Sequence, residues 1–415
     1  MSDFATGARA ATEALRALFP PTPLLRNDHL SARFGAEIWL KREDLSPVRS
    51  YKIRGAVNAM RKRLAVNPAG RKFVCASAGN HAQGVAFACR HFGVQGTIFM
   101  PVTTPQQKIL KTRTFGGDQV EIRLIGDIFD QSLKAAQEFC AAEGAHFLSP
   151  FDDADVIEGQ ASVAVEMLAQ LGHAPDMVIL PVGGGGLGAG VAQYLRAQQV
   201  GSELRFVEPQ GGASFQAALA AGRPVTLEKI DSFVDGASVA RMGARSFAAL
   251  RDTPSESVLI APENRICVTM LQMLNIEGIV LEPAGALSID VLEQLRDQIA
   301  GKTVVCLTSG GNFDFERLPE VKERAMRFQG TKKYFMLRLP QRPGALRDFL
   351  ATLGPQDDIA RFEYLKKTAR NFGTVLIGIE TSEPGNFHSL FARMQTAGFT
   401  FTDITDDEVI AGFII

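Results

Sequence analysis

A lysine at position 52 stands in a stretch that could do covalent chemistry with a carbonyl compound. The stretch is KREDLSPVRSYKIRGA, residues 41–56, in which Ser50 is placed to cap the start of a helix. The positive end of that helix, with Arg49 and Arg54 nearby, would disfavour the ammonium form and lower the pKa of Lys52. Such a lysine can act as a nucleophile or form a Schiff base. On this stretch alone, a solvated basic helix start remains the alternative.

A second stretch, SAGNHAQG at residues 77–84, lies between an expected strand and an expected helix. The amide of Asn80 and the free backbone N–H groups of a helix start suit a carboxylate or phenolate oxygen. An ordinary turn that uses Gly79 for its backbone angles and Asn80 as the cap explains these residues equally well. His81 could be a base, although local capping is the simpler interpretation.

Four consecutive glycines occur in PVGGGGLGAG, residues 181–190, after another apolar strand. Without side chains in the way, their backbone N–H groups can converge on a phosphate at the helix N-terminus. The same run also fits a dinucleotide fingerprint, because Gly183, Gly185 and Gly188 satisfy G-x-G-x-x-G. Glu208 then ends the next strand at about the distance of a ribose-binding acid. An NAD(P)-dependent oxidoreductase therefore stays open at this point.

A serine at the end of a further expected strand completes the set. Ser309 lies in TSGGN, residues 308–312, and the carboxyl ends of parallel strands are where such sheets bind ligands. The glycine cradle, the lysine, the asparagine and the serine together account for four parts of pyridoxal phosphate: the phosphate, the aldehyde carbon, the 3-hydroxyl and the ring nitrogen. A dehydrogenase would leave Lys52, Asn80 and Ser309 without a role.

The elements that must position these residues form an α/β body. From about residue 72 to residue 312, short apolar runs alternate with longer helix-like stretches, which is typical of parallel sheets with helices on their faces. After a charged stretch, the order β-α-β-β-α-β over residues 334–405 predicts a ferredoxin-like α+β domain. We expect a catalytic domain over residues 1–325, with a smaller lobe at roughly 57–155, and a second domain over 331–415.

Composition excludes several partners of the 415-residue chain. Lys and Arg number 44 and Asp and Glu 45, so the net charge of −1 gives no electrostatic reason to bind nucleic acid or an anionic membrane. The N-terminal stretch has no long apolar run, so we expect neither a signal peptide nor a membrane span, and a cytoplasmic protein. Five scattered cysteines and six scattered histidines predict no disulfide framework and no metal site, and Glu208 has no second carboxylate beside it.

The motifs SYKIRGA, SAGNHAQG, GGGGL and SGGN, in this order, resemble those of the serine/threonine dehydratases, which are fold-type II pyridoxal phosphate enzymes. The resemblance covers residues 15–320 and implies two open α/β lobes like those of the tryptophan synthase β subunit. It implies that Lys52 forms the Schiff base with the cofactor, that Asn80 bonds its 3-hydroxyl and that Ser309 faces its ring nitrogen. The implied phosphate site is Gly183, Gly184, Gly185, Gly186 and Leu187, and the substrate carboxylate site is Ser77, Gly79 and Asn80.

The C-terminal segment resembles the ACT-like regulatory domain of biosynthetic threonine dehydratases, in a short form with one copy of the domain. This implies conversion of L-threonine to 2-oxobutanoate and ammonia, the first step of isoleucine biosynthesis, with the freed Lys52 amine as the base. It also implies control by isoleucine and valine. We further expect a homo-oligomer, either a tetramer or a dimer.

A catabolic dehydratase remains open as an alternative to this function, and two further alternatives are disfavoured. L-serine could be a substrate as well, as in the catabolic dehydratases, because one methyl group gives an apolar pocket only about 1–3 kcal/mol of discrimination. An amino-acid sensor with an inactive body would have no use for Lys52 facing a phosphate cradle. A two-base racemase is disfavoured, since Ala78 stands where the resemblance places the serine that serves as a second base.

Overall fold

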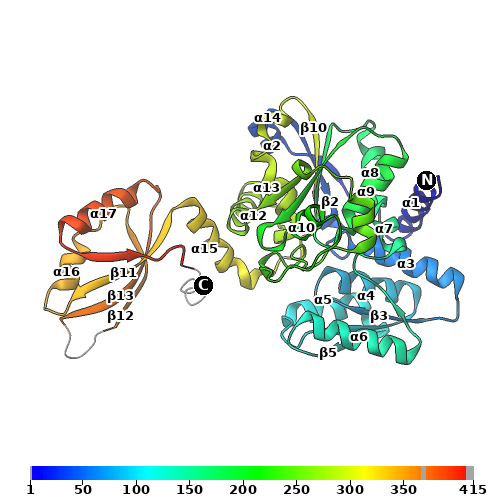
Figure 1. The fold of residues 1–415 in the computed structure, drawn as a ribbon, viewed down its shortest axis with the longest axis horizontal. Helices are drawn as coiled ribbons and strands as arrows, with labels where there is room; N and C mark the ends of the chain where they lie inside the picture. Colours follow the sequence, from blue (N-terminus) through cyan, green and yellow to red (C-terminus); the bar gives the residue numbers. More distant parts are fainter. Residues whose placement is uncertain (1, 366–370, 408–415) are drawn as a thin grey trace. The chain divides into compact units, whose positions relative to one another are not determined.

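The computed structural model divides the chain into two compact units, Met1–Asp314 and Phe315–Ile415 (Figure 1), and describes residues 2–365 and 371–407. Each unit has its own sheets and its own buried core. No helix in the described ranges is long and apolar enough to span a membrane.

The larger sheet of the first unit has six strands in the order β1-β2-β10-β7-β8-β9, all parallel except the antiparallel pair β1 and β2. Strand β10 pairs with β2 although almost the whole unit separates them in sequence, and Thr308 lies opposite Arg42. This pairing sets the loops that follow the two strands side by side. The strands are β1 Leu24–Arg26, β2 Glu37–Arg42, β7 Met177–Pro181, β8 Glu203–Pro209, β9 Val258–Ala261 and β10 Thr303–Thr308.

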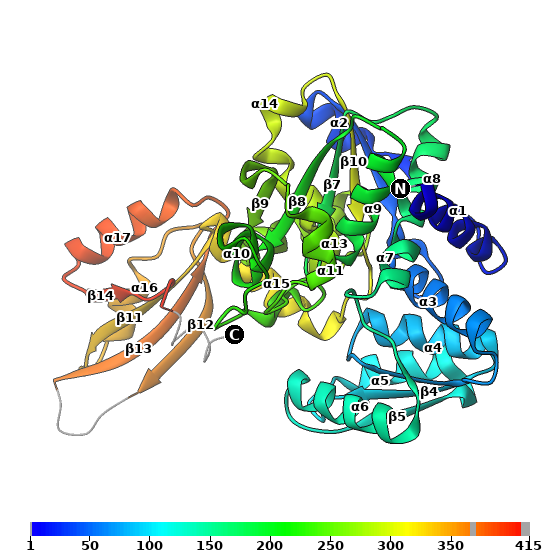
Figure 2. The same cartoon turned by 45° about the vertical axis from the view of Figure 1, so that its right-hand side comes forward.

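Helices cover both faces of the larger sheet, so its central strands are buried on both sides. In β7, all five residues are buried. Helices α1, α8 and α9 pack against one another and α11 packs on α9 (Figure 2), while α12 and α13 form another pair (Figure 1). The helices of this lobe are α1 Ser2–Arg16, α2 Asp28–Phe34, α7 Ala154–Gln160, α8 Ser162–Leu171, α9 Gly186–Ala197, α10 Ser214–Ala221, α11 Ala244–Leu250, α12 Glu263–Glu277, α13 Pro283–Asp290 and α14 Arg296–Ile299. The sequence pattern of residues 285–301 predicts one helix, and this prediction is wrong: α13 ends at Asp290, and a 3₁₀ turn separates it from α14.

The smaller sheet is fully parallel, in the order β5-β4-β3-β6. Helices α4 and α5 pack together (Figure 2), and α6 packs against β3 and β4, where Ala136 joins a small cluster with Val74, Ala76 and Phe99. Helix α3 packs on both α4 and α7 and so links the two lobes. The elements are α3 Lys52–Val66, β3 Lys72–Ala76, α4 Asn80–Phe92, β4 Gln95–Met100, α5 Gln106–Gly116, β5 Val120–Leu124, α6 Phe129–Glu143 and β6 His146–Phe147.

A buried ion network fixes helix α3. The Arg54 guanidinium donates to both carboxylate oxygens of Glu43, at 2.7 and 2.8 Å, and of Glu166, at 2.9 and 2.7 Å. The Lys41 ammonium also donates to Glu166, at 2.8 Å. All four side chains are almost completely buried. Removing one partner from such a network would leave a buried charge without its counter-charge, which is costly.

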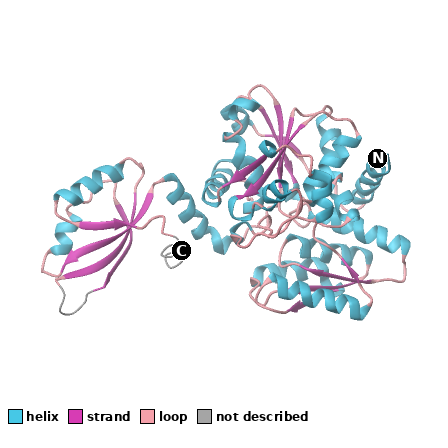
Figure 3. Cartoon of the chain, in the orientation of Figure 1, coloured by secondary structure: helices cyan, strands magenta, loops and turns pink. Residues whose placement is uncertain are grey.

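Helix α15 opens the second unit. The rest has the ferredoxin-like order that the sequence predicts, with an antiparallel sheet β12-β13-β11-β14 and the helices α16 and α17 (Figure 3). In β11, Phe335, Leu337 and Leu339 point inward at every second position and pack with Phe349 and Phe387 from the helices. The elements are α15 Leu318–Gln329, β11 Lys332–Pro340, α16 Ala345–Leu350, β12 Asp358–Leu365, β13 Phe372–Glu380, α17 Asn386–Thr396 and β14 Thr400–Asp403. The sequence pattern predicts that the second strand of this domain covers residues 360–368, of which 366–368 lie outside the described ranges.

Candidate active site

Lys52 is the first residue of helix α3, and its ammonium Nζ donates to the carbonyl oxygen of Pro150 at 2.8 Å. Burial lowers the pKa of Lys52 to about 8, against the opposing influence of the Glu282 carboxylate. The direction of the shift is the predicted one, but its main cause is burial. The Arg54 guanidinium is instead engaged with the buried carboxylates of Glu43 and Glu166.

The predicted capping role of Ser50 is wrong. Tyr51 occupies the N-cap position of α3, and it makes no side-chain capping hydrogen bond. The backbone of Ser50 is held by the Ser46 hydroxyl and forms a β-bridge to Gly310. The Tyr51 N–H donates to the Ser309 carbonyl at 3.1 Å. The chain before Lys52 is therefore fixed by the loop after β10 and not by a local cap.

Asn80 opens helix α4, while Gly79 holds the N-cap position, so Asn80 is not a cap. The Asn80 amide nitrogen donates to Glu282 Oε1 at 2.6 Å, and its oxygen accepts from Asn312 Nδ2 at 2.7 Å. Both partners come from the larger lobe. The sequence analysis missed Glu282, whose one signal is an acidic residue inside the otherwise apolar run GIVLEPAGALS. Burial and the neighbouring Asp235 raise the pKa of Glu282 to about 7.

The four glycines form the turn between strand β7 and helix α9, which begins at Gly186. A Cβ atom on Gly184 would lie 2.2 Å from the ring of Phe151, and one on Gly183 would lie 2.9 Å from the Ala237 backbone. Gly185 has a φ of 86°, in the region that favours glycine. The turn therefore admits no side chains, and it leaves the N–H groups of a 12-residue helix free for an anion, which fits a phosphate group.

His81 is not a base in this arrangement. Its side chain is 3% exposed, and Nε2 lies 2.9 Å from the Leu148 carbonyl oxygen, which a neutral imidazole N–H there can bond. Burial, reinforced by the Lys52 charge, lowers the pKa of His81 to about 3. The imidazole therefore holds the segment from Leu148 to Pro150, whose last carbonyl accepts from Lys52.

The remaining predicted residues occupy the ends of two strands. Ser309 follows β10, is 3% exposed and donates from Oγ to the Ala284 carbonyl at 3.2 Å. Ser77 follows β3, and its hydroxyl accepts from the N–H of Gly79 at 3.2 Å. A Cβ atom on Gly79 would meet nothing within 4 Å, so there is open space beside this turn.

The structure connects the predicted residues through two side chains that the sequence analysis did not select. The charge of Glu282 acts on Lys52, and the same carboxylate accepts a hydrogen bond from Asn80. Phe151 lies against the glycine turn, and its ring centroid is 6.0 Å from the Lys52 ammonium. Two further residues of the larger lobe line the turn: Ala237 lies against Gly183, and the Gly243 N–H donates to the Gly184 carbonyl at 3.2 Å.

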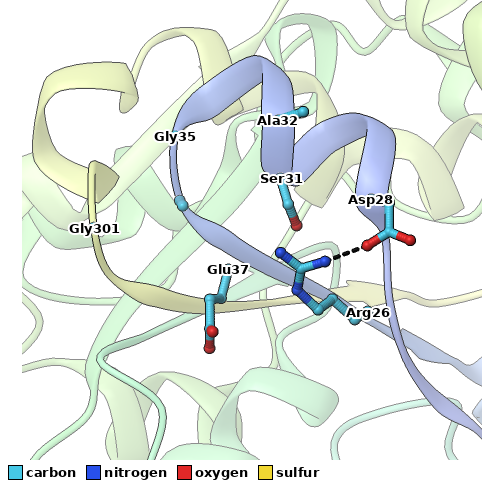
Figure 4. A pocket seen from close by; sticks show the side chains of 8 residues that line it. Arg26, Asp28, Ser31, Ala32, Gly35, Glu37 and Gly301 are labelled. Atoms are coloured by element: carbon cyan, nitrogen blue, oxygen red, sulfur yellow. Dashed lines mark hydrogen bonds and ion pairs between the residues drawn. The ribbon is translucent and has the colours of Figure 1, made fainter.

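A separate surface pocket of about 460 Å³ surrounds Gly35, Glu37 and Gly301 and includes none of the predicted residues (Figure 4). It lies at the end of the sheet where β2 and β10 begin, whereas open α/β sheets bind ligands where their strands end.

Glu208 is also outside the candidate site. Its carboxylate accepts from the N–H groups of Phe215 and Gln216, at 2.7 and 2.9 Å, and so caps α10. No cluster of three metal-binding side chains occurs in the described part of the chain.

Comparison with known proteins identifies the family. Residues 15–310 match the family model described as pyridoxal-phosphate dependent enzyme, and residues 323–414 match the C-terminal regulatory domain of threonine dehydratase. The L-threonine dehydratase biosynthetic IlvA of Bacillus subtilis is 47% identical over 395 residues, which cover 95% of this chain and 93% of that protein. The chain belongs to the biosynthetic threonine dehydratases. The equivalent protein of Lactococcus lactis is 45% identical to this dehydratase over 93% of both chains.

Solved structures agree with the family assignment. Threonine deaminase isoform 2 of Solanum lycopersicum, in its processed form, is 34% identical, with a TM-score of 0.72 over 78% of this dehydratase and 94% of that chain. A second threonine deaminase, from an organism abbreviated T.th., is 32% identical, with a TM-score of 0.69 over 75% and 98% of the respective chains. The predicted fold-type II body with a C-terminal regulatory domain is confirmed. The NAD(P)-dependent alternative is not favoured, since the glycine run belongs to a pyridoxal phosphate enzyme.

Proposed function

We propose that this dehydratase converts L-threonine to 2-oxobutanoate and ammonia at the site around Lys52, in the first step of isoleucine biosynthesis. The observation that carries the proposal is a partly buried lysine with a lowered pKa that shares neighbours with both other motifs: Glu282 acts on its charge and bonds Asn80, and Phe151 lies against both its ammonium and the glycine turn. Bound pyridoxal phosphate supplies an electron sink for the carbon that loses its proton.

Four groups of this chain would hold the cofactor. Lys52 would bind its aldehyde carbon, Asn80 its 3-oxygen, and Ser309 its ring nitrogen. The phosphate would lie on the turn of Gly183 to Gly186 and the N–H of Leu187, where the anion gains from the helix N-terminus. A neutral hydroxyl beside the ring nitrogen, in place of a carboxylate, suits elimination better than transamination.

Lys52 is the natural base for the proton on the α-carbon of threonine, because it must lie beside that carbon. With a pKa of about 8, about one tenth of the Lys52 side chains are unprotonated at pH 7, against well under 0.1% for an ordinary lysine. Ser77, Gly79 and Asn80 would receive the substrate carboxylate in the open space at the start of α4.

The second unit is where we expect the small-molecule effectors to bind. We expect isoleucine to lower activity and valine to oppose it by binding to this regulatory domain, which matches that of threonine dehydratases. We also expect the dehydratase to act in the cytoplasm as a dimer or tetramer.

The decisive experiment compares oxoacid formation from L-threonine and L-serine, each with and without isoleucine. We expect the enzyme to turn over L-threonine with a roughly tenfold or greater preference over L-serine, because the additional methyl group of threonine is worth about 1–3 kcal/mol in an apolar pocket. Equal or higher turnover of serine would favour the catabolic alternative. Absence of oxoacid from both substrates would contradict the proposed reaction.

A further inference from the structure

Glu282 is the one carboxylate that bonds directly to a residue predicted to hold the cofactor, among the contacts described. It lies just before helix α13, is 5% exposed, and accepts from the Asn80 amide nitrogen at 2.6 Å. The loop after β10 leaves room for this carboxylate, since a Cβ atom on Gly310 would lie 2.1 Å from Glu282 Oε1. The backbone N–H of Asn312 gives the carboxylate a second donor. The Glu282 carboxylate is thus held in the site by two hydrogen-bond donors and by the space that Gly310 leaves.

The hydrogen bonds around Asn80 determine which way its amide faces. An amide could be turned over, exchanging its oxygen and nitrogen, if its neighbours could both donate and accept. Here the Asn312 Nδ2 group can only donate, and a Glu282 carboxylate can only accept. The Asn80 oxygen is therefore directed to Asn312 and its nitrogen to Glu282. Because the nitrogen carries two hydrogens, one N–H remains for a ligand oxygen.

We propose that Glu282 is a positioning residue, which holds the Asn80 amide so that its remaining N–H binds the 3-oxygen of pyridoxal phosphate. This inference rests on the proposed function. Glu282 does not itself contact the cofactor in this account; it acts through Asn80. Without the carboxylate, the Asn80 amide would lose the partner that orients its nitrogen, and the hydrogen bond to the cofactor would weaken.

Burial and the charged groups around Glu282 determine the pH at which its carboxyl group is ionised and can accept with both oxygens. Lys52 and Tyr51 face it from the start of α3, Lys108 and Lys111 from α5, and Asp235 from the larger lobe. Burial and Asp235 raise its pKa to about 7, whereas Lys108 and the bonds from Asn80 and Asn312 lower it. The carboxylate therefore changes its charge near neutral pH, beside the group that would bind the cofactor oxygen.

The first test is a double-mutant cycle on cofactor affinity, measured by titrating each apoprotein with pyridoxal phosphate. We expect Glu282→Ala to weaken binding about tenfold, as for the loss of a hydrogen bond to an ionised group. Glu282→Gln, whose side-chain oxygen can still accept from Asn80, should stay within about threefold of the unaltered chain. In an Asn80→Ala background, Glu282→Ala should cost less than about twofold. Full additivity of the two losses would overturn the proposal.

The second test follows the visible absorbance of the holoenzyme against pH. We expect the unaltered enzyme to show a transition near pH 7 and Glu282→Gln to lack it. Glu277→Gln is the matched control, because Glu277 also accepts from an asparagine amide, that of Asn27 at 2.9 Å, at the start of α2. Glu277→Gln should keep the transition. The same curve for the unaltered enzyme and Glu282→Gln would overturn the proposal.

The results separate this inference from the proposed function. If the unaltered chain binds pyridoxal phosphate and deaminates threonine while Glu282→Ala keeps its full cofactor affinity, only the positioning role fails. If the unaltered chain forms no coloured complex, the proposed function fails and the positioning role with it. Thermal unfolding of each apoprotein checks that Glu282→Ala is folded, and Glu282→Gln tests the pH transition independently of that variant.

Discussion

Two cations of helix α3, only two residues apart, have opposite electrostatic environments. Burial lowers the pKa of Lys52 to about 8, and no carboxylate oxygen is hydrogen-bonded to its ammonium among the described contacts. Arg54 is also buried, but the carboxylates of Glu43 and Glu166 raise its pKa. Burial alone therefore does not decide the direction of the pKa shift. The pKa falls at Lys52, whose ammonium has no hydrogen-bonded carboxylate among the described contacts, and rises at Arg54, which has two.

The lowered pKa of Lys52 predicts a stability effect that depends on pH. Because the folded chain binds this proton more weakly than the unfolded chain, the cost of burying the charged amine is full below pH 8 and disappears towards pH 10.5. We expect the Lys52→Met apoprotein to be more stable than the unaltered apoprotein by about 1–3 kcal/mol at pH 7. The difference should shrink as the pH rises from 8 to 10.5. Urea unfolding at several pH values measures it, and a difference that does not vary with pH would contradict the lowered pKa.

At the scale of elements, three of the motifs that we propose to hold the cofactor lie in segments that directly follow a strand. Asn80 follows β3, the glycine turn follows β7, and Ser309 follows β10. The alternation of strands and helices was enough to place these turns at the carboxyl ends of parallel strands, and this prediction is confirmed. The expected cap at Ser50 was wrong because tertiary contacts with Gly310 and Ser309 override the local capping pattern.

The sequence could not identify residues whose role depends on distant partners. Glu282 meets Asn80 across 202 positions of the chain, and nothing in the spacing of either motif indicates that contact. Phe151 lies in a loop that packs on Gly184 and carries no motif of its own. Local patterns predicted the residues that we propose to hold the cofactor. They did not predict the side chains, such as Glu282 and Phe151, that contact those residues.

The glycine turn predicts that adding one methyl group, in Gly184→Ala, weakens the binding of pyridoxal phosphate. Gly184→Ala would place a Cβ atom 2.2 Å from the Phe151 ring, so either the ring or the turn must move. We expect the affinity for pyridoxal phosphate to fall at least tenfold, since the N–H groups of the turn would no longer converge. Titration of the apoprotein measures this loss. Gly201→Ala is the control, because a Cβ atom there meets nothing within 4 Å and should leave the affinity unchanged.

At the scale of the whole molecule, catalysis and regulation are assigned to units with separate cores. The core of the second unit is a cluster that includes Phe335, Phe349 and Phe387, and all of its buried members come from that unit. The cores of the first unit likewise contain only its own residues. Each unit therefore has the buried apolar surface that independent folding requires.

This division predicts that activity and its control can be separated. A chain that ends at Asp314 should deaminate threonine within about threefold of the full-length rate and should no longer respond to isoleucine. Initial rates at several isoleucine concentrations measure both properties, with the full-length chain as the reference. A full-length chain that ignores isoleucine and valine would contradict the proposed effectors, although not the proposed reaction.

The most direct test of the central claim, that Lys52 holds the cofactor and carries the reaction, is the variant Lys52→Ala. This variant should lose both the visible absorbance of the Schiff base between the lysine and pyridoxal phosphate and the turnover of L-threonine. Lys62→Ala is the matched control on the same helix, since Lys62 is partly exposed and pairs with Glu158 at 3.0 Å; it should keep both properties. Retention of either the absorbance or the turnover in Lys52→Ala would contradict the account.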